Sequence, residues 1–114
     1  MNGFENKKTQ KLVEAVLSLK TTAEAERFLR DLLTEPEIAE FGNRYRAAEM
    51  LTDKLPYTQI EKETGLSSTT IARVSKWLNA GGDGYKVVIA RLNKKHHHHT
   101  PTRVGKGLSL RKKK

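Results

Sequence analysis

The stretch YTQIEKETGLSSTTIARVSKWLN, residues 57–79, has the pattern of two short amphipathic helices joined at Gly65. Glycine permits the left-handed backbone conformation that a sharp bend between two helices requires. Apolar residues flank the glycine and then recur at helical spacing, namely Ile60, Leu66, Ile71, Val74 and Leu78. The pattern predicts a helix-turn-helix over residues 57–78, with Ser67 or Ser68 capping the second helix.

The second helix of this pair carries short polar side chains at its start and cations further along. In a helix-turn-helix protein the start of that helix enters the major groove, where small and hydroxyl side chains reach base edges and cations bind phosphate or guanine. We predict DNA contacts from Thr58, Ser67, Ser68, Thr69, Ala72, Arg73 and Lys76. The alternative is an ordinary helical hairpin with a solvated face, and Glu61, one turn before the glycine, departs from the small residue that such motifs prefer.

Helical periodicity extends over the rest of residues 1–93, which we interpret as one domain. Apolar residues at helical spacing predict helices over residues 6–20 and 85–92 and two more that begin at Thr21 and Thr34. Each of these threonines precedes a glutamate by three positions, as in a capping box. The run AGGDG, residues 80–84, predicts a flexible break. The expected fold is all-α with about six helices.

The net charge of +9 is concentrated at the C-terminal end of the chain. Residues 94–114 hold eight basic residues and no acid, whereas residues 1–93 hold 14 basic and 13 acidic residues. Because the helical pattern stops at Lys94, we expect residues 94–114 to form a disordered basic tail. Such a tail suits a polyanion such as nucleic acid, and it also suits a purely solubilising role.

Several classes of function find little support in the sequence. The chain lacks cysteine, its start lacks the apolar core of a signal peptide, and no apolar run reaches the roughly 20 residues that span a bilayer. We therefore expect a cytoplasmic location and no membrane partner. All four histidines lie at residues 96–99, with no acid or cysteine beside them to complete a metal site. We expect no catalytic residue, no cofactor and no physiological metal.

A family resemblance covers about Leu32 to Leu92. The segments LLTEPEIAEFGNRYRAAEML and TGLSSTTIARVSKWLN resemble the tryptophan repressor family and its bacterial relatives of the YerC/YecD type. The resemblance implies an entwined, all-helical homodimer whose first helices build a shared core. It also implies a roughly palindromic DNA site with one reading helix in each half-site.

The resemblance also suggests a vestigial ligand pocket. The family's two arginines that sandwich the corepressor match Arg44 and Arg73, and its two pocket threonines match Thr34 and Thr70. A glycine and a serine of the family's pocket are replaced here by Val74 and Trp77. Both replacements narrow the space, so we expect no binding of free tryptophan. Trp77 would fill the place of the corepressor or serve as an ordinary core residue; Arg44, like Arg46, would equally suit an ion pair with Glu40 or Glu49.

Two functions therefore stay open. The first is a sequence-specific transcriptional regulator that binds double-stranded DNA, most simply a repressor, with any small-molecule effector unknown. The second is a helical protein–protein interaction module whose basic tail binds nucleic acid without sequence preference. Base-edge contacts by Ser68, Thr69 and Arg73 would distinguish the first from the second.

Overall fold

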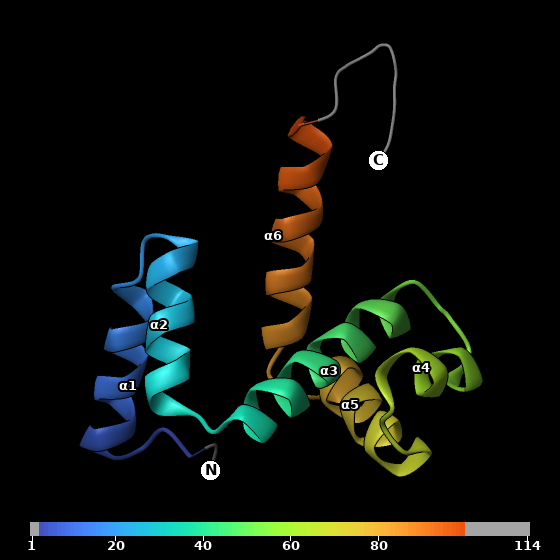
Figure 1. Ribbon diagram of the computed structural model, residues 1–114. Coiled ribbons are helices and arrows are strands. Elements are labelled where there is room, and N and C mark those ends of the chain that lie inside the picture. Colours follow the sequence, from blue (N-terminus) through green and yellow to red (C-terminus); the bar gives the residue numbers. More distant parts are fainter. Residues whose placement is uncertain (1–2, 100–114) are drawn as a thin grey trace. The chain divides into compact units, whose positions relative to one another are not determined.

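The computed structural model describes the backbone of residues 3–99 and the side chains of residues 3–95. Within these residues the chain forms six helices and no strand (Figure 1). The helices are α1 (Lys7–Leu17), α2 (Thr22–Leu32), α3 (Glu35–Thr52), α4 (Tyr57–Thr64), α5 (Ser68–Ala80) and α6 (Gly84–His99). The predicted all-α fold of about six helices is confirmed, and none of the described helices is long and apolar enough to cross a membrane.

The chain divides into two compact units, Met1–Phe41 and Gly42–Lys114, with the boundary inside α3. In the first unit, threonines cap α2 and α3 as predicted. The Thr34 hydroxyl accepts from the backbone N–H of Glu37 at 3.3 Å, and the Glu37 carboxylate accepts from the backbone N–H of Thr34 at 2.9 Å. Thr21 likewise accepts from the backbone N–H of Glu24 at 3.1 Å, but the reciprocal bond of that glutamate goes to Lys20. Both caps satisfy backbone donors that a helix start leaves unpaired.

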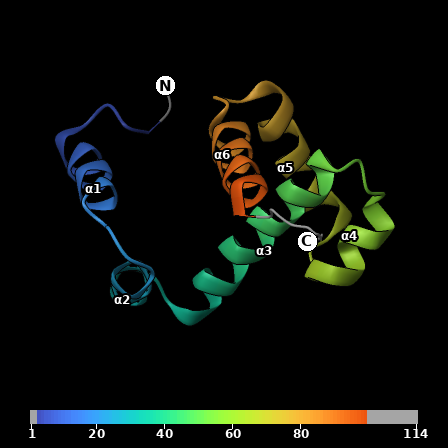
Figure 2. The same cartoon turned by 90° about the horizontal axis from the view of Figure 1, so that it is seen from above.

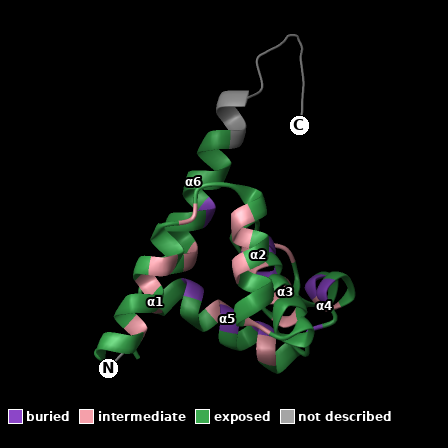
Figure 3. Ribbon diagram, turned by 60° about the vertical axis from the view of Figure 1, so that its left-hand side comes forward, coloured by how far each residue is buried: buried purple, intermediate pink, exposed green. Residues whose placement is uncertain are grey.

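The first unit has no interior of its own. Neither α1 nor α2 contains a buried residue (Figure 3). Their apolar stripes are partly open, with large side chains at least 37% exposed at Leu12, Val16, Leu17, Leu29 and Leu32. Short isolated helices are marginal in water, and most of their stability in proteins comes from burying an apolar stripe. The apolar stripes of α1 and α2 are therefore expected to pack against another surface.

The second unit contains the core. Buried residues from α3, α4, α5 and α6 pack into one cluster, which consists of Ala47, Ala48, Met50, Ile60, Leu66, Ile71, Val74 and Ile89. Both views show α4 and α5 side by side (Figures 1 and 2), and α5 also contacts α6. Met50, Ile60 and Ile71 are the largest fully enclosed side chains, so three helices meet there. This cluster fixes the angle between α4 and α5.

Two helix ends differ from the prediction. The first helix stops at Leu17 rather than residue 20, where the Ser18 hydroxyl donates to the carbonyl of Ala15 at 2.7 Å. Ser and Thr side chains compete with the backbone in this way and favour helix ends. The last helix continues through Lys94 and Lys95 to His99, so the predicted boundary at Lys94 falls inside α6. Lysine does not oppose a helix, and the next residue that does is Pro101. Residues 100–114 lie outside the described part of the chain.

Candidate nucleic-acid interface

The turn between α4 and α5 depends on Gly65 in the left-handed conformation, with φ of 74°. Its backbone N–H donates to the carbonyl of Glu61 at 2.8 Å and closes α4. The buried Thr64 hydroxyl then accepts from the backbone N–H of Leu66 at 3.2 Å and donates to the carbonyl of Ile60 at 2.7 Å. The backbone N–H groups of Gly65 and Leu66 are therefore both paired, and the turn forms a compact corner between the two helices.

Ser67 caps α5, which decides between the two serines considered from the sequence. Its hydroxyl accepts from the backbone N–H of Thr70 at 3.1 Å and donates to the Thr70 hydroxyl at 3.1 Å. Ser68 is the first residue of the helix and is exposed. The start of α5 therefore presents Ser68 and Thr69 to solvent on a capped, ordered helical turn.

The two faces of α5 are sharply divided. Ile71, Val74 and Leu78 are buried, and all are 6% exposed or less. The residues predicted to contact DNA lie on the open side, where Ser68, Thr69, Ala72, Arg73 and Lys76 are all exposed. This face bears two cations and no acid, so it is suited to a polyanion.

Thr58 lies apart from this face, on α4. It is exposed in the first turn of that helix, whose N-cap position is held by Pro56 with no side-chain hydrogen bond. The helix start therefore offers backbone N–H groups that no side chain caps, which is the usual environment of a phosphate contact in a helix-turn-helix.

Arg46 on α3 forms a hydrogen-bonded ion pair with Glu63 near the end of α4. Its Nε donates to Oε2 of Glu63 at 2.6 Å, and its Nη1 donates to Oε1 of Glu49 at 3.2 Å. The bond to Glu63, followed by the bond to Glu49, raises the pKa of the Arg46 guanidinium above its ordinary value. The bond to Glu49 matches the pairing predicted from spacing, whereas the bond to Glu63 spans 17 positions and was not predicted.

Tyr45 on α3 lies beside Tyr85 on α6, with ring centroids 6.5 Å apart. Burial, with a smaller contribution from the nearby Glu49 carboxylate, raises the pKa of its phenol. The hydroxyl therefore stays protonated in the physiological range, and the pair acts as packing between α3 and α6.

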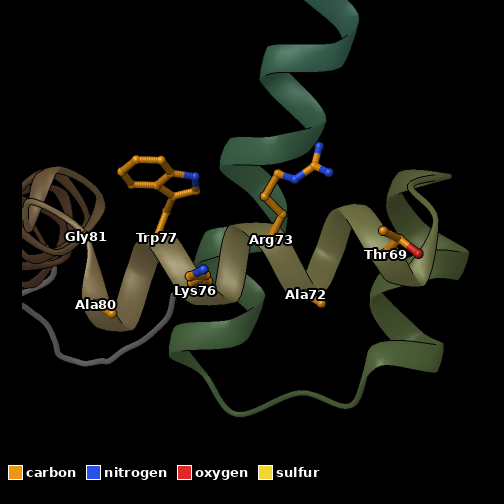
Figure 4. A pocket seen from close by; sticks show the side chains of 7 residues that line it. All are labelled: Thr69, Ala72, Arg73, Lys76, Trp77, Ala80 and Gly81. Carbon is orange, nitrogen blue, oxygen red and sulfur yellow. The ribbon is translucent and has the colours of Figure 1, made fainter. Parts of the chain in front are cut away.

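The open face of α5 includes a hollow of about 720 Å³ that extends along the helix from Thr69 to Gly81. Figure 4 shows that the side chains of Arg73 and Trp77 project from the same side of α5. The hollow is lined by Thr69, Ala72, Arg73, Lys76, Trp77, Ala80 and Gly81. All of these belong to α5 and its C-cap, so the surface is a property of this one helix.

The residues of the predicted ligand pocket do not all line this hollow. Arg73 and Trp77 share the hollow, but Val74 belongs to the core and Thr70 is half-buried and bonded to Ser67. Arg44 is half-buried on α3 and does not line the hollow, and the hydroxyl of Thr34 is engaged in its helix cap. Val74 therefore packs in the core and does not narrow the hollow that Arg73 and Trp77 line.

Trp77 is not a core residue, so that alternative was wrong. Its side chain is 62% exposed. The helical period puts position 77 close in angle to position 73, on the open face, about 100° from the buried Leu78 but only about 60° from the buried Val74, at the edge of the buried stripe. Sequence reasoning also missed Ala80 and Gly81, which it assigned only to a break. Their spacing of three and four residues from Trp77 is the signal that places them beside it.

The histidine run lies at the C-terminal end of α6. The backbone of His96–His99 belongs to α6, but the side chains lie outside the described residues. Among the residues whose side chains are described, no group of three potential ligands is close enough to hold a metal ion.

Three features together define a helix-turn-helix protein: the capped helix α5, the turn at Gly65, and the core cluster that joins α4 to α5. The family model for the Trp repressor protein matches residues 7–93. The uncharacterised protein YerC of Bacillus subtilis is 40% identical over 89 residues, which cover 78% of this chain and 86% of that protein.

Solved structures agree with the sequence comparison. A TrpR-like protein from Eubacterium eligens superposes with a TM-score of 0.76 at 39% identity, covering 79% of this chain and 93% of that one. A second solved chain, from Staphylococcus aureus, gives a TM-score of 0.75 at 33% identity, covering 79% and 90% respectively. The chain belongs to the Trp repressor family, as its sequence resemblance predicted.

Proposed function

We propose that this protein is a sequence-specific transcriptional regulator, most simply a repressor, that binds double-stranded DNA through α5. The observation that carries the proposal is the division of α5 into a buried stripe and an open face with Ser68, Thr69 and Ala72 at its start and cations further along. Small residues let a helix backbone approach base edges, and Arg73 and Lys76 supply charge for phosphates. Membership of a family of DNA-binding regulators supports the same conclusion.

The working form on this proposal is a homodimer in the cytoplasm. Two reading helices related by a two-fold axis would address two half-sites, which gives the operator its approximate palindromic symmetry. The exposed apolar stripes of α1 and α2 support the dimer, because a second copy would supply the interior that these helices lack.

L-tryptophan is not the effector on this proposal. Trp77 brings an indole of the protein's own to the face that also bears Arg73, and Val74 fills core space where the family has a glycine. The cap and the core packing of α5 come from the chain's own residues.

Selection from randomised duplexes, followed by gel shifts of the enriched duplex against a scrambled one, tests the proposal. Thr69→Glu adds a carboxylate to the groove-facing start of α5 and should reduce the preference for the enriched duplex by about 1–3 kcal/mol for each base contact that it removes. The matched control is Glu61→Gln, on the preceding helix. Failure to enrich any sequence, or an unchanged preference in Thr69→Glu, would favour the protein–protein module instead.

A further inference from the structure

Trp77 is a large aromatic side chain that the core cluster of α3 to α6 does not enclose. It is the sole tryptophan of the chain and 62% of it is open to solvent. It stands on the same helix face as Thr69 and Arg73 and lines the same hollow (Figure 4). A large exposed aromatic side chain on a cationic face is a feature of binding surfaces rather than of a solvated helix.

The indole lies close to Gly81 at the C-cap of α5. A Cβ atom at position 81 would lie 2.8 Å from Cε3 of Trp77 and 2.5 Å from its carbonyl oxygen. That same carbonyl accepts from the backbone N–H of Gly81 at 3.0 Å. The absence of a side chain at the C-cap therefore makes room for the ring to lie against the end of α5 and presents its other side outward.

Helix geometry decides which part of a duplex this ring would meet. Trp77 is eight residues beyond Thr69, so it lies about 12 Å further along the helix axis. The major groove is itself about 12 Å wide. If the start of α5 enters the groove, a residue two turns later reaches the rim, where the sugar–phosphate backbone runs.

We infer that Trp77 is a DNA-backbone contact, packing its indole on deoxyribose at the groove rim and donating its Nε1–H to a phosphate oxygen. The inference rests on the proposed function and extends it to a residue that the helix-turn-helix pattern did not include. Lys76 and Arg73 flank the ring with positive charge, and no acid lines the hollow, so a phosphodiester chain is the occupant that the charges favour. Because sugar and phosphate are common to all sequences, the contact adds affinity and not discrimination.

Intrinsic fluorescence of the full-length protein tests this directly, since Trp77 is the only tryptophan that can be excited. Saturation with either an enriched duplex or a scrambled duplex at low salt should protect the indole from quenching by acrylamide. Binding without any change in quenching would overturn the inference and leave the proposed function intact. Complete absence of duplex binding would overturn both.

Variants supply the second measurement. Trp77→Ala should weaken binding to enriched and scrambled duplexes alike, by roughly tenfold, whereas Trp77→Phe should keep the packing and lose only the hydrogen bond. The matched control is Val87→Ala: Val87 is 44% exposed and lies on the side of α6 away from the buried Ile89. Equal affinities for Trp77→Ala and Val87→Ala, or a loss confined to the enriched duplex, would contradict a backbone contact. Should Trp77→Ala fail to fold, the fluorescence of the wild-type protein still decides.

Discussion

Arg46 on α3 donates to Glu63 on α4 across 2.6 Å, and this bond joins two helices that the core also joins. The side chains of Arg46 and Glu63 are 44% and 46% exposed, so solvent screens the pair. An exposed ion pair of this kind contributes about 0.2–1 kcal/mol. It joins α3 to the last turn of α4, next to the corner at Gly65.

Replacing Glu63 by glutamine should lower the free energy of unfolding by less than about 1 kcal/mol, because the pair is half in water. The difference should shrink as salt is added, since exposed pairs are screened. Urea unfolding at two salt concentrations measures both effects, with Glu61→Gln as the control on the same helix. A large, salt-independent decrease would mean that Glu63 supports the fold in another way.

Gly65→Ala should destabilise the protein by about 1–2 kcal/mol, because position 65 has φ of 74° and a Cβ atom opposes that conformation. The space around the glycine is open, so the cost is one of backbone strain alone. Gly82→Ala is the control: its Cβ position is also open, without a positive φ. Equal stability of the two variants in thermal unfolding would contradict the role assigned to the corner.

The protein is expected to be a homodimer at micromolar concentration. Light scattering should give twice the chain mass of 12.9 kDa. Leu29→Asp, which introduces charge into a stripe that is 41% exposed at that position, should shift the protein towards the monomer. A wild-type mass of one chain would refute the assembly.

L-tryptophan should leave both the melting temperature and the DNA affinity unchanged. A ligand that bound the native state would stabilise it by about 2.7 kcal/mol at a concentration one hundred times its dissociation constant. Thermal unfolding with and without the amino acid measures this, with glycine as the control addition. A rise in melting temperature specific to L-tryptophan would show that a pocket exists after all.

Removal of residues 100–114 should weaken binding to enriched and scrambled duplexes by the same factor. This segment carries six basic residues and no acid, and its removal leaves α6 complete to His99. The slope of log affinity against log salt should become shallower by about 0.9 for each phosphate that the segment neutralises. Titration of both duplexes at several salt concentrations gives the slopes; an unchanged slope would assign the tail to solubility alone.

The local features of this fold were accessible from the sequence, because each depends on a few neighbouring residues. Gly65, the two threonine caps and the alternation of Ile71, Val74 and Leu78 with polar residues predicted the corner, the helix starts and the buried face. The bond between Arg46 and Glu63 could not be predicted, because spacing rules apply only to residues within about one helical turn of each other.

The exposure of Trp77 shows a different limit. An aromatic residue at helical spacing is buried or open according to the phase of the helix, and a family correspondence had suggested either a filled pocket or the core. Helical spacing puts position 77 about 60° from the buried Val74 and about 100° from the buried Leu78, at the edge of the buried stripe, so spacing alone did not decide its exposure. The length of α6 was underestimated for a simpler reason. The apolar periodicity ends near Lys94, but a helix can continue beyond its apolar stripe where the residues have adequate helix propensity.

The missing interior of α1 and α2 has a consequence for gene dosage. Residues 3–41 contain no buried position, and on the proposed homodimer another copy supplies the interior of this part of the chain. The stability of such a protein is tied to its own concentration. A cell that makes few copies would then hold mostly unassembled chains, exposed to proteases and unable to span two half-sites. Occupancy of the operator would rise more steeply than in proportion to synthesis, and a modest change in transcription of the regulator would be amplified before any effector acted.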